Sequence, residues 1–225
     1  MMRLLLLVSP YRWTKLLIAR PIYVGIWFTP PDNLHMTTLE IRAARPAPEI
    51  EQIVSKIRAR SGLVPDIINY THDRQPRLIK PRISYDSAAI ALSFVPAVGE
   101  GTNDEWRKRN DRYTYHHLRR DLFDKVTAAG IDVAGRYAVP SAHITIARFI
   151  SHDGSDRAGN AIDHRHISEF VKRLEEINEG LKFKYWPKDN LENSTRAGEW
   201  CVGEEKGLEL IKGTIWYGKG EQIHT

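Results

Sequence analysis

One short pattern occurs twice in the chain, and this repetition constrains the fold more than any other feature. The two copies are residues 35–37 (His-Met-Thr) and residues 143–145 (His-Ile-Thr), and each copy opens a strand-like run. Side chains alternate across a strand, so each histidine shares a face with its threonine while the middle residue points to a core. If the two strands lie together in one sheet, two imidazoles and two hydroxyls face a common groove.

Such a groove suits the cleavage of a phosphodiester. Imidazole titrates near neutral pH, so one ring can be neutral while the other is protonated. The neutral ring takes a proton from water, and the charged ring donates one to the leaving alkoxide. The threonine hydroxyls donate hydrogen bonds to the non-bridging oxygens, where negative charge develops. This chemistry requires no metal and no other cofactor.

The same residues also admit simpler interpretations. A single His-x-Thr in a strand is an ordinary core pattern, but two copies in matching strand contexts favour a functional role. A binding module that captures a nucleotide or RNA without turnover remains an alternative, as does a structural protein with fortuitous motifs. The enzyme is favoured because a pure binder does not need a paired acid and base.

The rest of the chain predicts an α+β or mixed α/β domain. Apolar residues recur with helical spacing in residues 46–60, 115–129 and 166–181. Strands are expected at residues 4–8, 34–41, 77–85, 88–95, 141–150, 199–204 and 208–217, with a hairpin-like break at 205–207. Residues 98–111 and 151–163 are expected to be loops. The chain has no Gly-rich phosphate loop, which argues against Rossmann and P-loop folds.

Composition limits the class of protein and its partners. The 225 residues include 33 Lys and Arg against 28 Asp and Glu, an excess that fits an anionic ligand but not the wrapping of duplex DNA. A single cysteine excludes an internal disulfide and a zinc site built on several thiolates. The apolar runs at 4–8 and 22–28 are too short for a signal peptide or a membrane span. We therefore expect a soluble intracellular protein, in the cytoplasm or the nucleus.

Five stretches of the chain resemble the 2H phosphoesterases, which are defined by two His-x-(Ser/Thr)-x motifs. The likeness is to a fungal branch described as RNA ligase/cyclic nucleotide phosphodiesterase. The residues that carry it are 32–37, 113–120, 140–149, 200–207 and 213–218. Residues 1–30 depart from the family pattern, which has a strand and a full helix before the first motif.

The resemblance implies a bilobal α+β fold over residues 1–225, taken as a single domain with an atypical segment at 1–30. Two lobes of antiparallel sheet plus helices, related by a pseudo-two-fold axis, would surround a central cleft. It also implies a metal-independent phosphodiesterase that hydrolyses a 2′,3′-cyclic phosphate of a nucleotide or RNA end, with RNA 2′,5′-ligase activity as a further option. His35 and His143 would form the acid/base pair, with either in either role, and Thr37 and Thr145 would bind the phosphate. We expect a monomer.

Two further residues, Arg148 and Tyr115, are candidate substrate contacts. Arg148 lies five residues after His143, and strand parity places it opposite the His143 face unless a bulge intervenes. Glu40 has the same offset after His35, and we do not predict that Glu40 and Arg148 pair. Tyr115 is a candidate for stacking on a base, although aromatic residues at helical spacing are more often part of a core.

Overall fold

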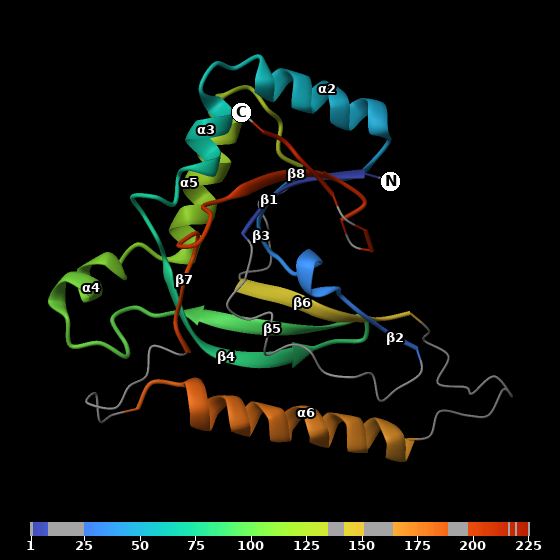
Figure 1. The fold of residues 1–225 in the computed structure, drawn as a ribbon, viewed down its shortest axis with the longest axis vertical. Helices are drawn as coiled ribbons and strands as arrows, with labels where there is room; N and C mark the ends of the chain where they lie inside the picture. Colours follow the sequence, from blue (N-terminus) through green and yellow to red (C-terminus); the bar gives the residue numbers. More distant parts are fainter. Residues whose placement is uncertain are drawn as a thin grey trace, which may run out of the picture.

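The fold is built on a nine-stranded antiparallel sheet with helices packed on it (Figure 1). The computed structural model describes residues 2–8, 25–134, 142–150, 164–188, 198–215, 217–218 and 220–224. Within these ranges the strands are β1 (Met2–Val8), β2 (Ile26–Phe28), β3 (Met36–Arg45), β4 (Arg77–Tyr85), β5 (Ala89–Pro96), β6 (Ala142–Phe149), β7 (Trp200–Cys201), β8 (Glu209–Gly213) and β9 (Glu221–Gln222). The helices are η1 (Pro31–Asn33), α2 (Ala47–Arg58), α3 (Leu63–Ile68), α4 (Glu105–Asn110), α5 (Tyr115–Ala128) and α6 (His164–Tyr185). The α+β class expected from the sequence is confirmed.

The sheet consists of two halves that meet at its centre. The strand order is β7-β4-β5-β6-β3-β1-β8-β9, with β2 paired to β6. Between β3 and β6, the register within the described residues is the single antiparallel pair Met36–Ile144. One half therefore comprises β7, β4, β5, β6 and β2, and the other comprises β3, β1, β8 and β9. Figure 1 shows the two halves one above the other.

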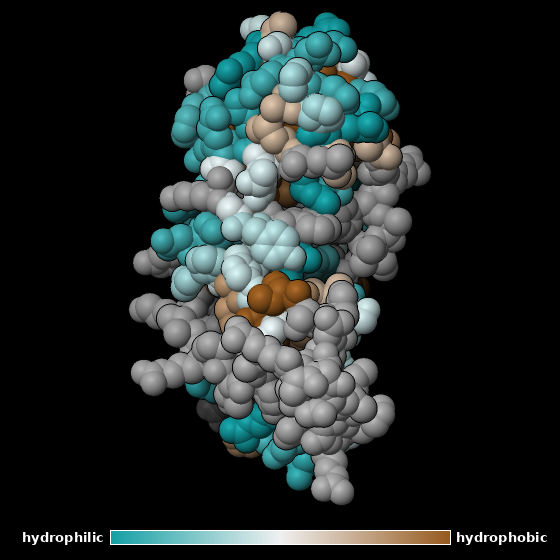
Figure 2. Space-filling view, turned by 90° about the vertical axis from the view of Figure 1, so that its right-hand side faces the viewer, coloured by the Kyte–Doolittle hydropathy of each residue, from teal (hydrophilic) through white to brown (hydrophobic). Residues whose placement is uncertain are grey.

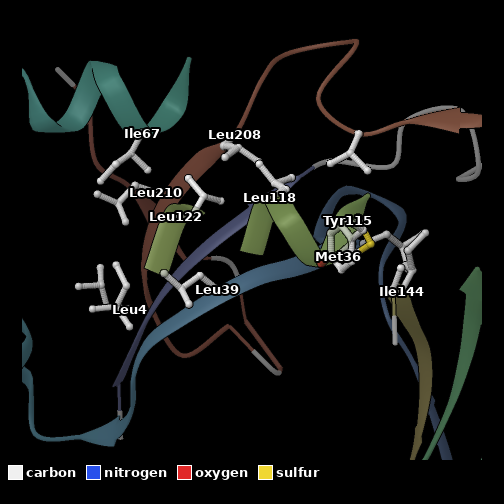
Figure 3. Packing of buried hydrophobic residues seen from close by; sticks show 14 of the residues in the cluster. Leu4, Met36, Leu39, Ile67, Tyr115, Leu118, Leu122, Ile144, Leu208 and Leu210 are labelled. Carbon is white, nitrogen blue, oxygen red and sulfur yellow. The ribbon is translucent and has the colours of Figure 1, made fainter. Parts of the chain in front are cut away.

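Amphipathic helices cover the half that contains β1, β3 and β8. In α2, Ile50, Val54 and Ile57 recur at helical spacing and are all buried, which makes one stripe that faces the sheet. The helix α5 buries a similar stripe, and Figure 3 shows two of its leucines close to Leu39, Leu208 and Leu210. The surface at the upper end of the molecule, around α2, is mainly hydrophilic (Figure 2).

The other half of the sheet is covered by α6, whose side chains also protect the edge of β4. The short strand β7 pairs only with the start of β4 in the described residues. Further along, the buried Asn178 of α6 accepts from the Ile83 N–H at 2.7 Å and donates to the Ile83 carbonyl at 3.1 Å. Trp186 Nε1 donates to the Pro81 carbonyl at 3.0 Å. Backbone groups that an edge strand would expose are thus satisfied by side chains of α6 and of Trp186, the residue that follows it.

The expected helices and most of the expected strands are present with small changes at their ends, but the strand expected at 199–204 is only β7 (Trp200–Cys201) and that expected at 208–217 is only β8 (Glu209–Gly213). Two short helices, α3 and α4, were not predicted, and α4 lies inside the segment expected to be a loop at 98–111. The expected loop at 151–163, residue 141 of the strand expected at 141–150, residue 216 of the strand expected at 208–217, and residues 1 and 9–24 of the atypical segment lie outside the described residues.

The expected hairpin around residues 205–207 is wrong. The strand β7 pairs with β4, whereas β8 pairs with β1, so the two are not partners. Gly203 has a φ of 83°, and a Cβ there would lie 2.1 Å from Thr71 Oγ1. The chain turns at this glycine, and the N–H of Leu208 then donates to the Ile68 carbonyl at 2.9 Å. These contacts carry the chain from one end of the sheet towards the other instead of back along β7.

Candidate functional site

His35 lies immediately before β3, between two anchored residues. Leu34 and Met36 are buried on either side of it. His35 Nδ1 lies 2.8 Å from the carbonyl oxygen of Asn33, the last residue of η1. A carbonyl oxygen only accepts hydrogen bonds, so we infer that Nδ1 carries the proton and that Nε2 of the neutral ring is a free acceptor.

His143 and Thr145 lie on β6, the strand of the other half of the sheet that borders β3. The neighbouring strands hold β6 on both sides: His143 is opposite Ser93 of β5, and Thr145 is opposite Ala91. Beyond the end of β2, Thr29 donates from its backbone N–H to the Ile146 carbonyl at 2.9 Å and from Oγ1 to the Thr145 carbonyl at 3.1 Å. The backbone that carries the second motif is therefore fixed by contacts from two strands.

The two motifs meet at the junction of the two halves of the sheet. Their middle residues, Met36 and Ile144, are partners in the antiparallel register, and both have no exposed surface. Figure 3 shows them in contact with the core beside Tyr115. When the same register is continued by one residue, His35 lies across from Thr145, and Thr37 lies across from His143. Each imidazole therefore approaches the hydroxyl of the other motif.

A pocket of about 270 Å³ opens on the polar side of this junction. Its lining includes both imidazoles and both threonine hydroxyls of the repeated pattern: His35, Thr37, His143 and Thr145. The common groove that the sequence pattern required is thus present, and residues from both halves of the sheet form it.

A β-bulge in each motif strand brings one more residue into the pocket. In β6, Thr145 pairs with Ala91 but Ala147 pairs with Ile90, so Ile146 is an extra residue. The bulge reverses the alternation that follows it. Arg148 therefore lies on the same side as His143 and lines the pocket, so simple strand parity does not hold here.

The same irregularity occurs at the corresponding position of β3. Thr37 pairs with Leu7 and Leu39 pairs with Leu6, so Thr38 is the extra residue. Glu40 consequently lines the pocket as well. Glu40 forms an ion pair with Arg3 of β1, which also lines the pocket. The two motifs therefore match in their histidine, hydroxyl and bulge, and they differ in the charge of the residue at the fifth position after the histidine.

The electrostatics of the pocket favour a neutral His35. Burial lowers the pKa of His35 below its ordinary value of 6.5, because it penalises the charged ring. The hydrogen bond to the Asn33 carbonyl opposes this shift in the pKa, while the positive charges of Arg148 and His143 reinforce it. Arg148 and His143 line the same pocket as His35.

Tyr115 lies outside the pocket. It has no exposed surface, and its hydroxyl donates to the Thr37 carbonyl at 2.8 Å. A base cannot stack on a ring enclosed in this way, so the structure places Tyr115 as a support for the strand that carries Thr37. Tyr115 is therefore a core residue and not a stacking platform for a base.

Sequence analysis missed several lining residues. Arg3 and Leu5 of β1, Asp86 of the β4–β5 turn, and Ile215 all line the pocket. The repeated pattern does not contain these residues, because the strand and turn that carry them come from distant parts of the chain. Glu40 is the one described lining residue outside the motifs, apart from Arg148, whose position the sequence pattern indicates. It follows His35 by five residues, as Arg148 follows His143.

Among the described residues, no group of three or more His, Cys, Asp or Glu side chains is arranged to hold a metal ion. No described helix is both long enough and apolar enough to cross a membrane. The residues gathered in the pocket suit the binding of a small anion, because imidazole, hydroxyl and guanidinium groups all donate hydrogen bonds.

Comparisons with known proteins give only distant likenesses. No protein-family model matches the chain, and no curated protein matches it in sequence. A solved structure described as a phosphoesterase is 16% identical, with a TM-score of 0.42, and the match covers 99% of this chain and 94% of that one. The structure of the Thermus thermophilus protein TT0787 is 17% identical, with a TM-score of 0.35, over 66% of this chain and 75% of that one. Neither likeness assigns this chain to a family.

Proposed function

We propose that the protein is a phosphodiesterase that hydrolyses the 2′,3′-cyclic phosphate of a nucleotide or an RNA end. One observation carries this proposal: the imidazoles and hydroxyls of two motifs 108 residues apart line one small pocket together with Arg148. The bilobal arrangement suggested by resemblance belongs to the same proposal. Its support is a sheet whose two halves join at a single register pair beside the pocket.

The hydrogen bonds of His35 suit it to the role of general base. Its Nδ1 proton is held by the Asn33 carbonyl, which leaves Nε2 free to accept a proton from water. The lowered pKa of His35 keeps the ring neutral at pH 7. Burial is the main cause of the lowered pKa of His35, so we assign the proton-accepting role to His35 and the proton-donating role to its partner His143.

His143 then acts as the general acid. The oxygen of the activated water forms a bond to phosphorus, and the bond from phosphorus to one ribose oxygen breaks. His143 gives its proton to that ribose oxygen, and the water proton remains on His35. Thr37, Thr145 and Arg148 donate hydrogen bonds to the non-bridging oxygens as negative charge builds on them. The product is a phosphomonoester with a free neighbouring hydroxyl.

The test is the turnover of a 2′,3′-cyclic mononucleotide in the presence of EDTA. We expect wild-type protein to be active and His35→Ala and His143→Ala each to lose about 10²- to 10⁴-fold in rate. The double variant is expected to be little worse than either single variant, since the two residues act as a pair. His116→Ala is a matched control, because His116 is exposed and lies outside the pocket.

Unchanged turnover in either single variant, with a circular dichroism spectrum like that of the wild type, contradicts the proposal. Loss of wild-type activity in EDTA contradicts the metal-independent mechanism. Tight binding of the cyclic nucleotide without turnover would favour the alternative, a non-catalytic module of the same fold.

A further inference from the structure

A second and larger pocket, of about 710 Å³, lies where α4, the start of β4 and β7 meet. Figure 1 shows α4 projecting from the sheet beside β7 and the beginning of α5. We call it the arginine pocket, because five arginines are among the residues that line it. They are Arg74, Arg77, Arg107, Arg109 and Arg112. We call the pocket lined by His35, Thr37, His143 and Thr145 the histidine pocket, and among the described residues the two pockets have no lining residue in common.

The inner part of the arginine pocket is a network of paired charges. Arg77 is buried and donates to both carboxylate oxygens of Asp111, at 3.1 Å from Nε and 2.6 Å from Nη2. Glu199 accepts from Arg77 at 3.0 Å and pairs with Arg107 at 3.2 Å. Two arginines therefore face two carboxylates, and this network connects the end of α4 to β4 and to the residue before β7. The charges of Arg77 and Arg107 thus serve to hold these elements together.

The outer part is different, because its positive charge is not balanced in this way. Arg109 and Arg112 are exposed, and neither forms an ion pair with a carboxylate of the described ranges. Arg74 is exposed as well and lies 3.8 Å from Asp121, at the limit of an ion pair. Asp121 does not line the pocket, and besides Asp111 the acidic residue of the described lining is Asp73. The rim of the pocket is therefore positive, while its interior is neutral.

Two aromatic side chains line the same pocket. Trp106 is 64% exposed, which is unusual for so large an apolar group. Arg109 follows Trp106 by three residues on α4, so the two side chains lie on one side of the helix. Tyr113 is half-buried, and the guanidinium of Arg74 lies 5.7 Å from the centre of its ring. The pocket thus combines cations for phosphates with an aromatic face for a base.

We propose that the arginine pocket binds single-stranded RNA, with Arg109 and Arg112 on backbone phosphates and an unpaired base stacked on Trp106. Unpaired bases offer a ring face for stacking, which the bases of a duplex do not, and a concave site admits a single strand. This inference rests on the proposed function and deepens it. The preferred substrate would be an RNA chain and not a mononucleotide.

The position of the arginine pocket relative to the histidine pocket favours an RNA of several nucleotides as the ligand. Asp86, Ala88 and Ala89, at the turn between β4 and β5, line the histidine pocket, whereas Arg77, at the open end of the same hairpin, lines the arginine pocket. Ser93, the partner of His143, lies three residues from the Pro96 end of β5, which at about 3.3 Å each is roughly 10 Å. A mononucleotide held by the histidine motifs leaves the arginine pocket open, whereas an RNA of several nucleotides has the length to contact both sites.

The first experiment measures binding without catalysis. A fluorescent ten-nucleotide single-stranded RNA with a 3′-hydroxyl is titrated with the full chain, and fluorescence anisotropy is recorded at several salt concentrations. We expect Arg109→Ala/Arg112→Ala to weaken binding by about tenfold and to reduce the slope of log K against log salt by about 0.7 for each arginine removed. Trp106→Ala is expected to weaken binding with no change in that slope. Arg58→Ala/Arg60→Ala, which removes two exposed arginines elsewhere, serves as the charge-matched control.

The second experiment compares two substrates. For an RNA that ends in a 2′,3′-cyclic phosphate, the Arg109→Ala/Arg112→Ala variant is expected to raise KM about tenfold with kcat unchanged. Turnover of the cyclic mononucleotide is expected to stay at the wild-type level, because these arginines lie outside the histidine pocket.

The outcomes separate this inference from the proposed function. RNA binding equal in wild type and the double-arginine variant overturns the inference, whether or not cyclic phosphate is hydrolysed. Binding that depends on the arginines in a protein without any turnover supports the inference and overturns the proposed function. If a poly-glutamate peptide binds as tightly as the RNA and depends on the same arginines, the site is a general polyanion site and the RNA assignment is wrong.

Discussion

The two motif strands, β3 and β6, have the same local construction and opposite charge. Each has a histidine, a hydroxyl two residues later and a bulge at the third position after the histidine. The bulge brings the fifth residue into the pocket, where β3 presents Glu40 and β6 presents Arg148. Arg148 lowers the pKa of His35, whereas Glu40 is occupied by Arg3. The matching backbones of β3 and β6 therefore supply the two histidines and the two threonines. The fifth residue after each histidine differs in charge, and it gives the two sides of the pocket residues of opposite charge.

Among substitutions that compare the two strands beyond their histidines, the largest effect is expected at the fifth position, where the strands differ. Arg148→Ala removes a positive charge from the side of the pocket where the phosphate is proposed to bind, and kcat/KM is expected to fall about 10²- to 10³-fold. Glu40→Gln at the corresponding position is expected to change kcat/KM much less, since a carboxylate does not stabilise a phosphate. The measurement is steady-state turnover of a 2′,3′-cyclic nucleotide. A larger loss in Glu40→Gln than in Arg148→Ala would reverse the proposed assignment of the two sides.

A smaller effect is expected from two adjacent threonines of β3. Thr37→Val removes a hydroxyl that lines the pocket, and turnover is expected to fall about 10- to 100-fold, the value of one hydrogen bond to a charged group. Thr38, the bulge residue, is fully buried, and its hydroxyl has no hydrogen-bond partner among the described residues. Thr38→Val is therefore expected to leave turnover unchanged and to raise the free energy of unfolding by about 1 kcal/mol.

Denaturant unfolding together with turnover distinguishes the two substitutions. They are isosteric and lie on neighbouring residues, so each is the control for the other. Equal losses of turnover in Thr37→Val and Thr38→Val would contradict the role of the Thr37 hydroxyl. They would show that turnover depends on the backbone of the bulge.

The smallest effect concerns the pH dependence. Because the pKa of His35 is lowered from 6.5, the general base stays neutral below pH 6.5, and kcat/KM is expected to fall only as the pH drops through that lowered pKa. Arg148→Ala removes one of the positive charges that lower the pKa of His35. The acid limb measured for this variant is therefore expected to move up towards 6.5. An acid limb that does not move would contradict the proximity of Arg148 to the base.

The same shift has a consequence for stability with a definite sign. Below pH 6.5 the unfolded chain protonates His35 more readily than the folded protein does, so the free energy of unfolding falls as the pH decreases from 6.5 through the folded pKa. This loss is expected to be smaller in His35→Ala, as measured by denaturant titrations between pH 5 and 8, and the lowered pKa of His116 accounts for part of what remains.

Much of the fold follows from patterns within single segments. The helices at 46–60, 115–129 and 166–181 were predicted from their apolar spacing, and the strand at 77–85 was predicted with its observed ends. Residues 205–207 were misread, because the partners of β7 and β8 are set by Gly203 and by contacts with Thr71 and Ile68. Such contacts come from distant segments, and a local pattern does not contain them.

The site shows the same division. The repeated pattern indicated that two histidines and two threonines share a groove, because alternation in a strand is a local property. The positions of Glu40 and Arg148 depend on the bulges, and a bulge exists only relative to a partner strand. Alternation alone therefore placed Arg148 on the wrong face. Arg3 enters the pocket because β1 pairs with β3, which no spacing within either strand reveals.

The Met36–Ile144 pair also determines how the two imidazoles are spaced. Each histidine is next to a member of this pair, so a sideways displacement of one half-sheet relative to the other translates directly into a wider or narrower gap between proton donor and proton acceptor. The helices that flank the sheet can change their outer surfaces without affecting that gap. A substitution that changes the side-chain volume of Met36 or Ile144 is expected to change the distance between the two imidazole rings directly.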